Sequence, residues 1–209
     1  MNFPRPLFIP LKYVPAAPKE TILSYPVSCA NAVAHERLPN GGNHWCIYLS
    51  ISLPEPESTS TPNKEGQSVS INCSPSYSEP ATAKSSNGGS KAIVLVSHHE
   101  TPFSAWAAKS VRLDVIKHAP GNGSRGDSAR VLTVRDFVTL LEEEGRHLYE
   151  FDAEGRGCRF WTEDQVGLFY ERGLVVDGVQ VEEVREARTE FPGGRRYPLV
   201  VGDYYVEGV

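Results

Sequence analysis

The sequence lacks a long apolar run. No stretch approaches the roughly 18 consecutive apolar residues that a membrane helix needs. The N-terminal segment MNFPRPLFIPLKYVPAAP is broken by prolines, unlike the continuous apolar region of a signal peptide. The chain also lacks a basic excess, because its formal net charge is −5, and nucleic acid is therefore not an expected partner. These absences predict a soluble, cytoplasmic protein with no membrane span.

Cysteine is scarce, and cofactor motifs are missing. The four cysteines, Cys29, Cys46, Cys73 and Cys158, are widely spaced and include no CxxC pair. This spacing argues against a zinc ribbon and, in a reducing compartment, against a disulfide framework. No glycine-rich phosphate loop is followed by Lys and Ser or Thr. We therefore expect no cofactor, and the sequence leaves the oligomeric state open.

Length and composition indicate one globular domain. The chain has 209 residues, of which 40% are hydrophobic, enough for one domain with a core. Residues 1–26 are predicted to form an extended, proline-fixed arm, and residues 27–209 the domain itself. Within it, residues 54–90 are rich in Ser, Pro and Gly. Because such a segment buries too little apolar surface to offset its ordering entropy, we expect a flexible insertion at 54–90.

The patterns of apolar residues predict an α+β fold. Strands are expected at residues 27–35, 43–52, 91–98, 110–117 and 147–152. Residues 133–145 predict an amphipathic helix, since Thr133 and Asp136 fit a capping box and Gly145 follows the apolar stripe. We expect an antiparallel sheet of four to six strands packed by two or three helices.

A second helix, ending at Gly173, has two candidate starts. Thr162 and Gln165 fit a capping box, which places the start at Thr162. Gly157 instead allows a turn that starts the helix at Cys158. The difference matters because a thiol at a helix N-terminus gains thiolate character from the helix dipole and the free amides there.

The strongest chemical signal combines His44 with Cys158. In the strand at 43–52, one face carries Trp45, Ile47, Leu49 and Ile51, and the other carries His44, Cys46, Tyr48 and Ser50. An imidazole near Cys158 would complete a thiolate–imidazolium pair, and a third polar group would orient the ring. Asp114 is the candidate for that group, because its strand is expected to neighbour the His44 strand. Backbone amides around Cys158 would be the oxyanion donors.

Other interpretations of these residues remain open. His44 and Cys46 share a face and would begin a metal site if His98, His99 or Cys158 completed it. A histidine in a strand is more often structural than functional. A lone cysteine is more often a small buried apolar residue than a nucleophile. The alternative to catalysis is a binding or interaction module.

The segments NHWCIYL (43–49), SVRLDV (110–115) and RGCRFW (156–161) together resemble the circularly permuted papain-like group. This group includes NlpC-like hydrolases and lecithin:retinol acyltransferase-like proteins. The resemblance implies a cysteine-dependent hydrolase or acyltransferase that acts on an amide, ester or thioester. Cys158 would be the nucleophile, His44 the proton carrier and Asp114 the orienting residue. More narrowly, the set with TVRDF and LYEFD is similar to a family of small fungal proteins of unknown function.

Overall fold

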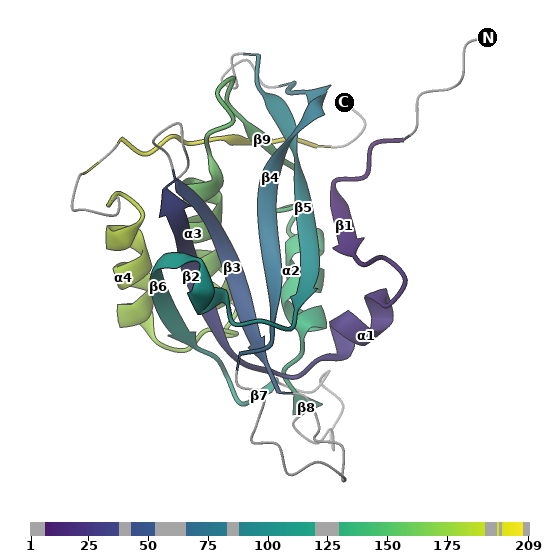
Figure 1. Cartoon of the computed structure of the whole chain (residues 1–209), viewed down its shortest axis with the longest axis vertical. Helices are drawn as coiled ribbons and strands as arrows, with labels where there is room; N and C mark the ends of the chain where they lie inside the picture. Colours follow the sequence, from purple (N-terminus) through teal and green to yellow (C-terminus); the bar gives the residue numbers. More distant parts are fainter. Residues whose placement is uncertain are drawn as a thin grey trace.

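The alternating stretch NHWCIYLSI forms strand β3 (Asn43–Ile51) in the computed structural model. The structure describes residues 7–37, 43–52, 66–82, 88–119, 130–190, 196 and 198–206. Within these ranges, an open, mostly antiparallel sheet has the order β10-β9-β5-β4-β3-β2-β6, and β1 pairs in parallel with β5 (Figure 1). The predicted α+β class is confirmed.

Long strands form the centre of the sheet, and shorter strands lie toward its edges. The sheet strands are β1 (Leu11–Val14), β2 (Val27–Arg37), β3, β4 (Ser68–Pro80), β5 (Ser90–His99), β6 (Ala107–Asp114), β9 (Tyr149–Phe151) and β10 (Asp203–Tyr204). A separate ribbon pairs β7 (His118–Ala119) with β8 (Arg130–Val131). The helices are α1 (Lys19–Ser24), α2 (Val134–Glu143), α3 (Cys158–Glu171) and α4 (Gly178–Ala187), with a 3-10 turn η2 (Phe103–Ala105).

Helices α2 and α3 cover one face of the sheet and bury its apolar side chains (Figure 1). Trp45, Ile47 and Leu49 of β3 belong to the same core cluster as Phe137 of α2 and Trp161 of α3. Burial of these large side chains against the sheet is the main source of stability. Both tryptophans are therefore core residues.

The predicted capping box of α2 is confirmed. The Thr133 backbone N–H donates to Asp136 Oδ2 over 2.7 Å, and the Thr133 side chain accepts from the Asp136 backbone N–H. These contacts satisfy donors that would otherwise be unpaired at the start of the helix. The helix begins at Val134 and ends at Glu143, within the predicted range.

The predicted flexible insertion at 54–90 is wrong for its middle part. Residues 68–80 form β4, a 13-residue strand between β3 and β5. Its composition is polar, but Val69, Ile71 and Cys73 alternate with polar residues and are fully buried on the helix side. A strand needs only one apolar face to join a core. Residues 54–65 and 83–87 of the predicted insertion lie outside the described residues.

The N-terminal arm and the strand number also need correction. Leu11–Val14 pairs with β5, and α1 follows with Ile22 and Leu23 buried. The described part of residues 1–26 thus belongs to the domain. Together with β4 and the short closing strand β10, this raises the sheet from the four to six strands expected to eight in the described chain. Among the described residues, no helix is long and apolar enough to cross a membrane.

Strands β3 and β4 pair over only part of their length. Their register runs from Ile47/Ile71 to Ser50/Ser68, whereas β3 begins at Asn43 and β4 continues to Pro80. Beyond the paired part, β3 stays with β2 and β4 stays with β5. The two strands diverge toward the end of the sheet at which α3 begins (Figure 1).

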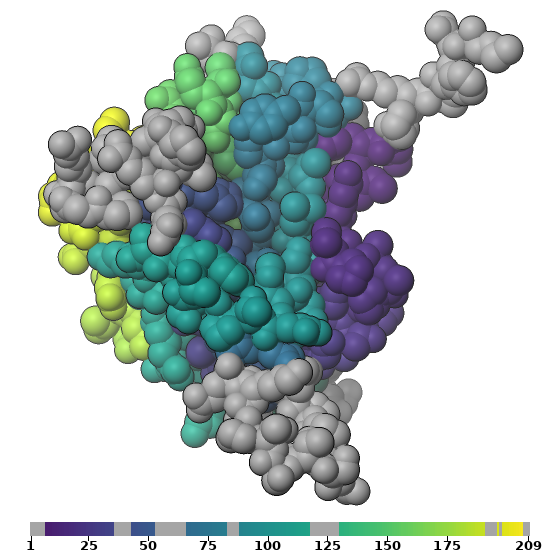
Figure 2. All heavy atoms as spheres, in the orientation of Figure 1, coloured from purple at the N-terminus to yellow at the C-terminus, as the bar shows by residue number. Residues whose placement is uncertain are grey.

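The other face of the sheet is covered near β3 by the segment around η2. Figure 2 shows this teal segment lying over the strands at the front of the molecule. Phe103 packs there against a second, smaller apolar cluster of Val33, Cys46 and Tyr48. Both faces of β3 are therefore buried, although its sequence alternates between apolar and more polar residues.

Candidate active site

Helix α3 begins at Cys158 and not at Thr162, so the thiol lies at the helix N-terminus. The residue before it, Gly157, has φ 148°, which favours glycine. A Cβ at this position would lie 3.0 Å from Tyr149 Oη. That hydroxyl donates to the Gly157 carbonyl over 3.1 Å and accepts from the Gly202 N–H over 2.8 Å. Tyr149 thus fixes the turn that presents Cys158.

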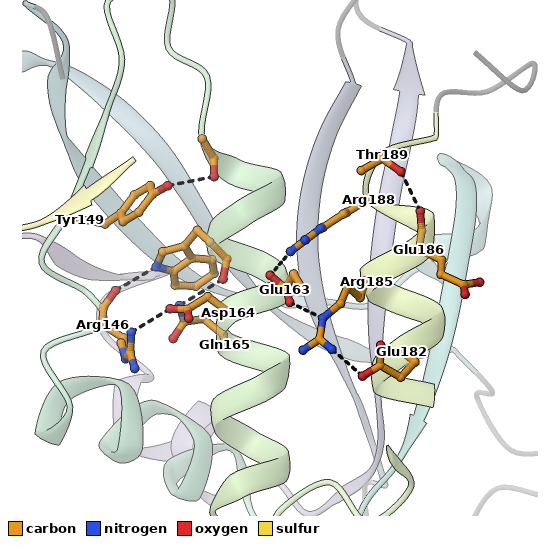
Figure 3. Close-up of polar contacts among 12 residues, drawn as sticks. Arg146, Tyr149, Glu163, Asp164, Gln165, Glu182, Arg185, Glu186, Arg188 and Thr189 are labelled. Carbon is orange, nitrogen blue, oxygen red and sulfur yellow. Dashed lines mark hydrogen bonds and ion pairs between the residues drawn. The ribbon is translucent and has the colours of Figure 1, made fainter. Parts of the chain in front are cut away.

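Ion pairs hold α3 from both sides (Figure 3). Asp164 accepts from Arg146 over 2.8 Å. On the other side, Glu163 accepts from Arg185 over 3.1 Å and pairs with Arg188. Glu163 is mostly buried, and buried charges are tolerated when they are paired. These contacts fix the position of the helix that carries Cys158.

The structure brings Cys158 and His44 together. The imidazole of His44 and the backbone N–H of Trp45 lie close enough to the Cys158 thiol to change its pKa. Burial raises the pKa of the Cys158 thiol, but the hydrogen bond and charge of His44, the Trp45 N–H and the charge of Arg159 bring it below its usual value. The arrangement therefore favours the thiolate.

The contacts that lower the pKa of Cys158 are matched by contacts that raise the pKa of His44. Burial lowers the pKa of its imidazole, but the hydrogen bond and negative charge of Cys158 and the hydrogen bond to Asn72 raise it above the usual value. Each member of the pair thus stabilises the charged form of the other, as in a thiolate–imidazolium pair.

Asn72 of β4 is the third polar group. Its Oδ1 lies 2.7 Å from His44 Nε2 and also accepts from Ser74 Oγ over 2.9 Å. Because a carbonyl oxygen only accepts, His44 carries its proton on Nε2 and directs Nδ1 to the thiol. Sequence reasoning missed Asn72 because it lies in the segment that was expected to be flexible. The one sequence feature that could have identified Asn72 is the alternation of this segment, in which Asn72 lies between the apolar residues Ile71 and Cys73.

Asp114 does not contact His44. Strand β2 lies between β6 and β3, so the expectation that the Asp114 and His44 strands are neighbours is wrong. The neighbouring position is taken by β4. Asp114 is exposed and accepts from Arg112 Nε and Gln180 Nε2, each over 3.1 Å. Those two hydrogen bonds, the one from Gln180 being the larger influence, lower the pKa of its carboxyl group.

Cys46, the thiol nearest to His44 in sequence, belongs to the second apolar cluster. Its Sγ donates to the Ile71 carbonyl over 3.4 Å, and burial raises its pKa. His99 Nε2 lies 2.9 Å from Ser70 Oγ, and His98 Nε2 lies 3.4 Å from Gln67 Oε1. In the part of the chain that the structure describes, no three His, Cys, Asp or Glu side chains gather as a metal-ion site.

A second histidine lies beside His44 and was not predicted. The ring centroids of His35 and His44 are 5.7 Å apart. Tyr48 Oη lies 3.3 Å from His35 Nε2 and accepts from Trp106 Nε1 over 3.1 Å. The Tyr48 hydroxyl can therefore donate its proton to His35 in the neutral form of the ring, and burial keeps the pKa of His35 low. His35 therefore does not compete with His44 for a positive charge.

His35 is expected to stay uncharged down to about pH 4. Burial, followed by the charges of His44 and His99, lowers the pKa of His35 to about 4. An unfolded histidine titrates near 6.5, so between these values the unfolded chain binds more protons. His35 alone therefore lowers the free energy of unfolding as the pH falls from about 6.5 to about 4. NMR titration, assigned with His35→Gln, measures the pKa, and a value near 6.5 would contradict the buried neutral state.

Fold and site together define an α+β protein with a Cys–His–Asn group where a helix N-terminus meets two diverging strands. The chain belongs to the family described as "Domain of unknown function (DUF7770)", whose model matches residues 29–205. The matched range contains Cys158, His44 and Asn72. No curated protein and no solved structure matches the chain.

Proposed function

We propose that the protein is a cysteine-dependent hydrolase or acyltransferase acting on an amide, ester or thioester. One observation carries the proposal: the Cys158 thiol at the start of α3 lies beside His44, whose Nε2 contacts Asn72 Oδ1 over 2.7 Å. A nucleophile, a base in contact with it and a group that orients the base are the three parts that nucleophilic catalysis requires.

In the proposed mechanism, the Cys158 thiolate attacks the carbonyl carbon, and a carbon–sulfur bond forms. The bond to the leaving group then breaks, and the leaving group takes a proton from the His44 imidazolium. Water or an acceptor molecule next attacks the acyl–enzyme and gives its proton to His44. The carbon–sulfur bond breaks, and the thiolate returns. Asn72 holds the ring with Nδ1 toward the sulfur throughout.

The chain order of these residues supports the resemblance to the circularly permuted papain-like group. The histidine strand β3 comes first, the strand with the orienting residue follows, and the helix with the cysteine comes last. The orienting residue we propose is Asn72 in place of Asp114, because Asn72 is the group in contact with the ring. Assignment to the permuted papain-like group is part of the proposal.

Iodoacetamide is expected to modify Cys158 faster than the other three cysteines at neutral pH. Cys158 is partly exposed and its pKa is lowered, whereas Cys29, Cys46 and Cys73 are buried. Peptide mapping by mass spectrometry measures the rate at each thiol. Equal, slow labelling of all four cysteines would contradict the proposal.

Transfer of an acyl group separates the enzyme from the alternative, a binding module without catalysis. p-Nitrophenyl acetate is expected to leave an acetyl group on Cys158, which intact-protein mass spectrometry detects. Cys158→Ser is the matched control, because it keeps the shape of the side chain and removes the thiol. A native protein whose Cys158 takes no acetyl group would favour the binding module.

A further inference from the structure

Asn43 is a buried amide with no hydrogen-bond partner in the described part of the chain. Its exposed fraction is 5%, and among the described residues neither Nδ2 nor Oδ1 forms a hydrogen bond. An unpaired buried polar group is costly, and native structures contain few of them. An amide retained under these conditions indicates a ligand that pairs with it during function.

Asn43 lies on the face of β3 that α3 covers. Asn43 is the first residue of β3 and precedes His44. Alternate residues of a strand point to the same face, so Asn43 shares a face with Trp45. Trp45 packs in the core cluster that includes Trp161 of α3, and its backbone N–H contacts the Cys158 sulfur. Asn43 therefore lies on the helix side of β3, at the end of the sheet where α3 begins.

The N-terminus of α3 supplies further hydrogen-bond donors at this place. The first amides of a helix have no acceptor within the helix. The N-cap residue is Gly157, and the helix has no side-chain cap. The Cys158 N–H thus combines a free donor with the positive end of the helix dipole. The Asn43 side chain and the Cys158 backbone thus offer two N–H donors at the end of the sheet where α3 begins.

We propose that Asn43 Nδ2 and the Cys158 backbone N–H bind the oxyanion that forms when Cys158 attacks its substrate. This inference rests on the proposed function. As Sγ bonds to the carbonyl carbon, the π electrons move to the oxygen, which then accepts a hydrogen bond from each N–H. When the intermediate collapses, the electron pair returns, the bond to the leaving group breaks, and the leaving group takes the proton from His44. Asn43 is thus a catalytic residue that sequence reasoning did not identify.

Two reactions of the same thiol separate this role from a structural one. Acetylation by p-nitrophenyl acetate passes through an oxyanion. Alkylation by iodoacetamide displaces iodide at a saturated carbon and forms none. Asn43→Leu and Asn43→Ala are expected to lower the acetylation rate of Cys158 by about 10²–10³-fold, the usual effect of removing one oxyanion donor. The alkylation rate of Cys158 stays at the wild-type value in both variants.

Thermal unfolding of the variants provides the second readout. Asn43→Leu removes two unpaired polar atoms and approximates the size of the side chain, so its melting temperature is expected to equal or exceed that of the wild type. Asn31 is the matched control. It is also a buried amide, but its Nδ2 donates to Ser50 Oγ over 3.1 Å and to the Tyr48 carbonyl over 3.4 Å. Asn31→Leu should lower the melting temperature and leave the ratio of acetylation to alkylation unchanged.

The outcomes distinguish a failure of the role proposed for Asn43 from a failure of the proposed function. Selective loss of acetylation in folded Asn43→Leu supports the assignment. Equal acetylation of the wild type and both variants overturns the role of Asn43 and leaves the proposed function intact. A parallel loss of acetylation, alkylation and melting temperature in both variants assigns Asn43 to the structure and overturns its catalytic role. If the wild-type thiol is not acetylated, both the proposed function and the role of Asn43 fail.

Discussion

Replacing His44 with glutamine is expected to slow acetylation of Cys158 by about 10²–10⁴-fold at neutral pH, the range that general acid–base catalysis contributes. The variant removes the base that takes the thiol proton and the charge that favours the thiolate. The rate is measured as acetyl-protein formed from p-nitrophenyl acetate. A His44→Gln variant that reacts as fast as the wild type would contradict the pairing.

The pH dependence of alkylation tests the same pair independently of leaving-group chemistry. Contacts with His44 lower the pKa of the Cys158 thiol. The wild-type rate is therefore expected to rise with pH through a midpoint below the ordinary thiol value. In His44→Gln, this midpoint moves to higher pH.

Asp114→Asn is the matched control for this experiment. Asp114 was the carboxylate that sequence reasoning placed beside His44, but it contacts Arg112 and Gln180 at the outer strand β6. Its replacement should change neither the acetylation rate nor the midpoint of alkylation. If Asp114→Asn slowed acetylation as much as His44→Gln, Asp114 and not Asn72 would be the residue that orients His44.

Trp161→Ala is expected to lower the free energy of unfolding by about 3–5 kcal/mol, as for other large buried aromatic residues. Trp161 is fully buried in the main core, and its Nε1 donates to the Arg146 carbonyl over 2.8 Å. The substitution leaves a cavity under α3 and an unpaired carbonyl. Urea unfolding, with Trp161→Phe as the milder comparison, measures both variants. A loss below about 1 kcal/mol would contradict the core role of this residue.

The sequence predicted the elements whose pattern is strong in itself. The alternation of β3 and the capping box of α2 predicted their positions closely. The polar composition of β4 concealed a strand, because the energy that orders it comes from neighbours on both sides and on the helix face. Local composition carries no information about those neighbours.

The candidate site was predicted only in part for the same reason. His44 and Cys158 stood out because few other side chains offered such chemistry in a plausible setting. The orienting residue depended on which strand lies beside β3, and the unrecognised β4 occupies that place. The unpaired state of Asn43 depends on the atoms around it in the folded chain. No sequence pattern expresses such a property.

The divergence of β3 and β4 has a consequence for the reactivity of the thiol. In a continuous ladder, a strand N–H that faces its neighbour donates to a carbonyl of that neighbour. Here the Trp45 N–H instead helps to lower the pKa of the Cys158 thiol. Longer pairing of the two strands and a stabilised thiolate would thus compete for one hydrogen. Substitutions that extend the β3–β4 register would therefore lower the reactivity of Cys158 without changing Cys158, His44 or Asn72 themselves.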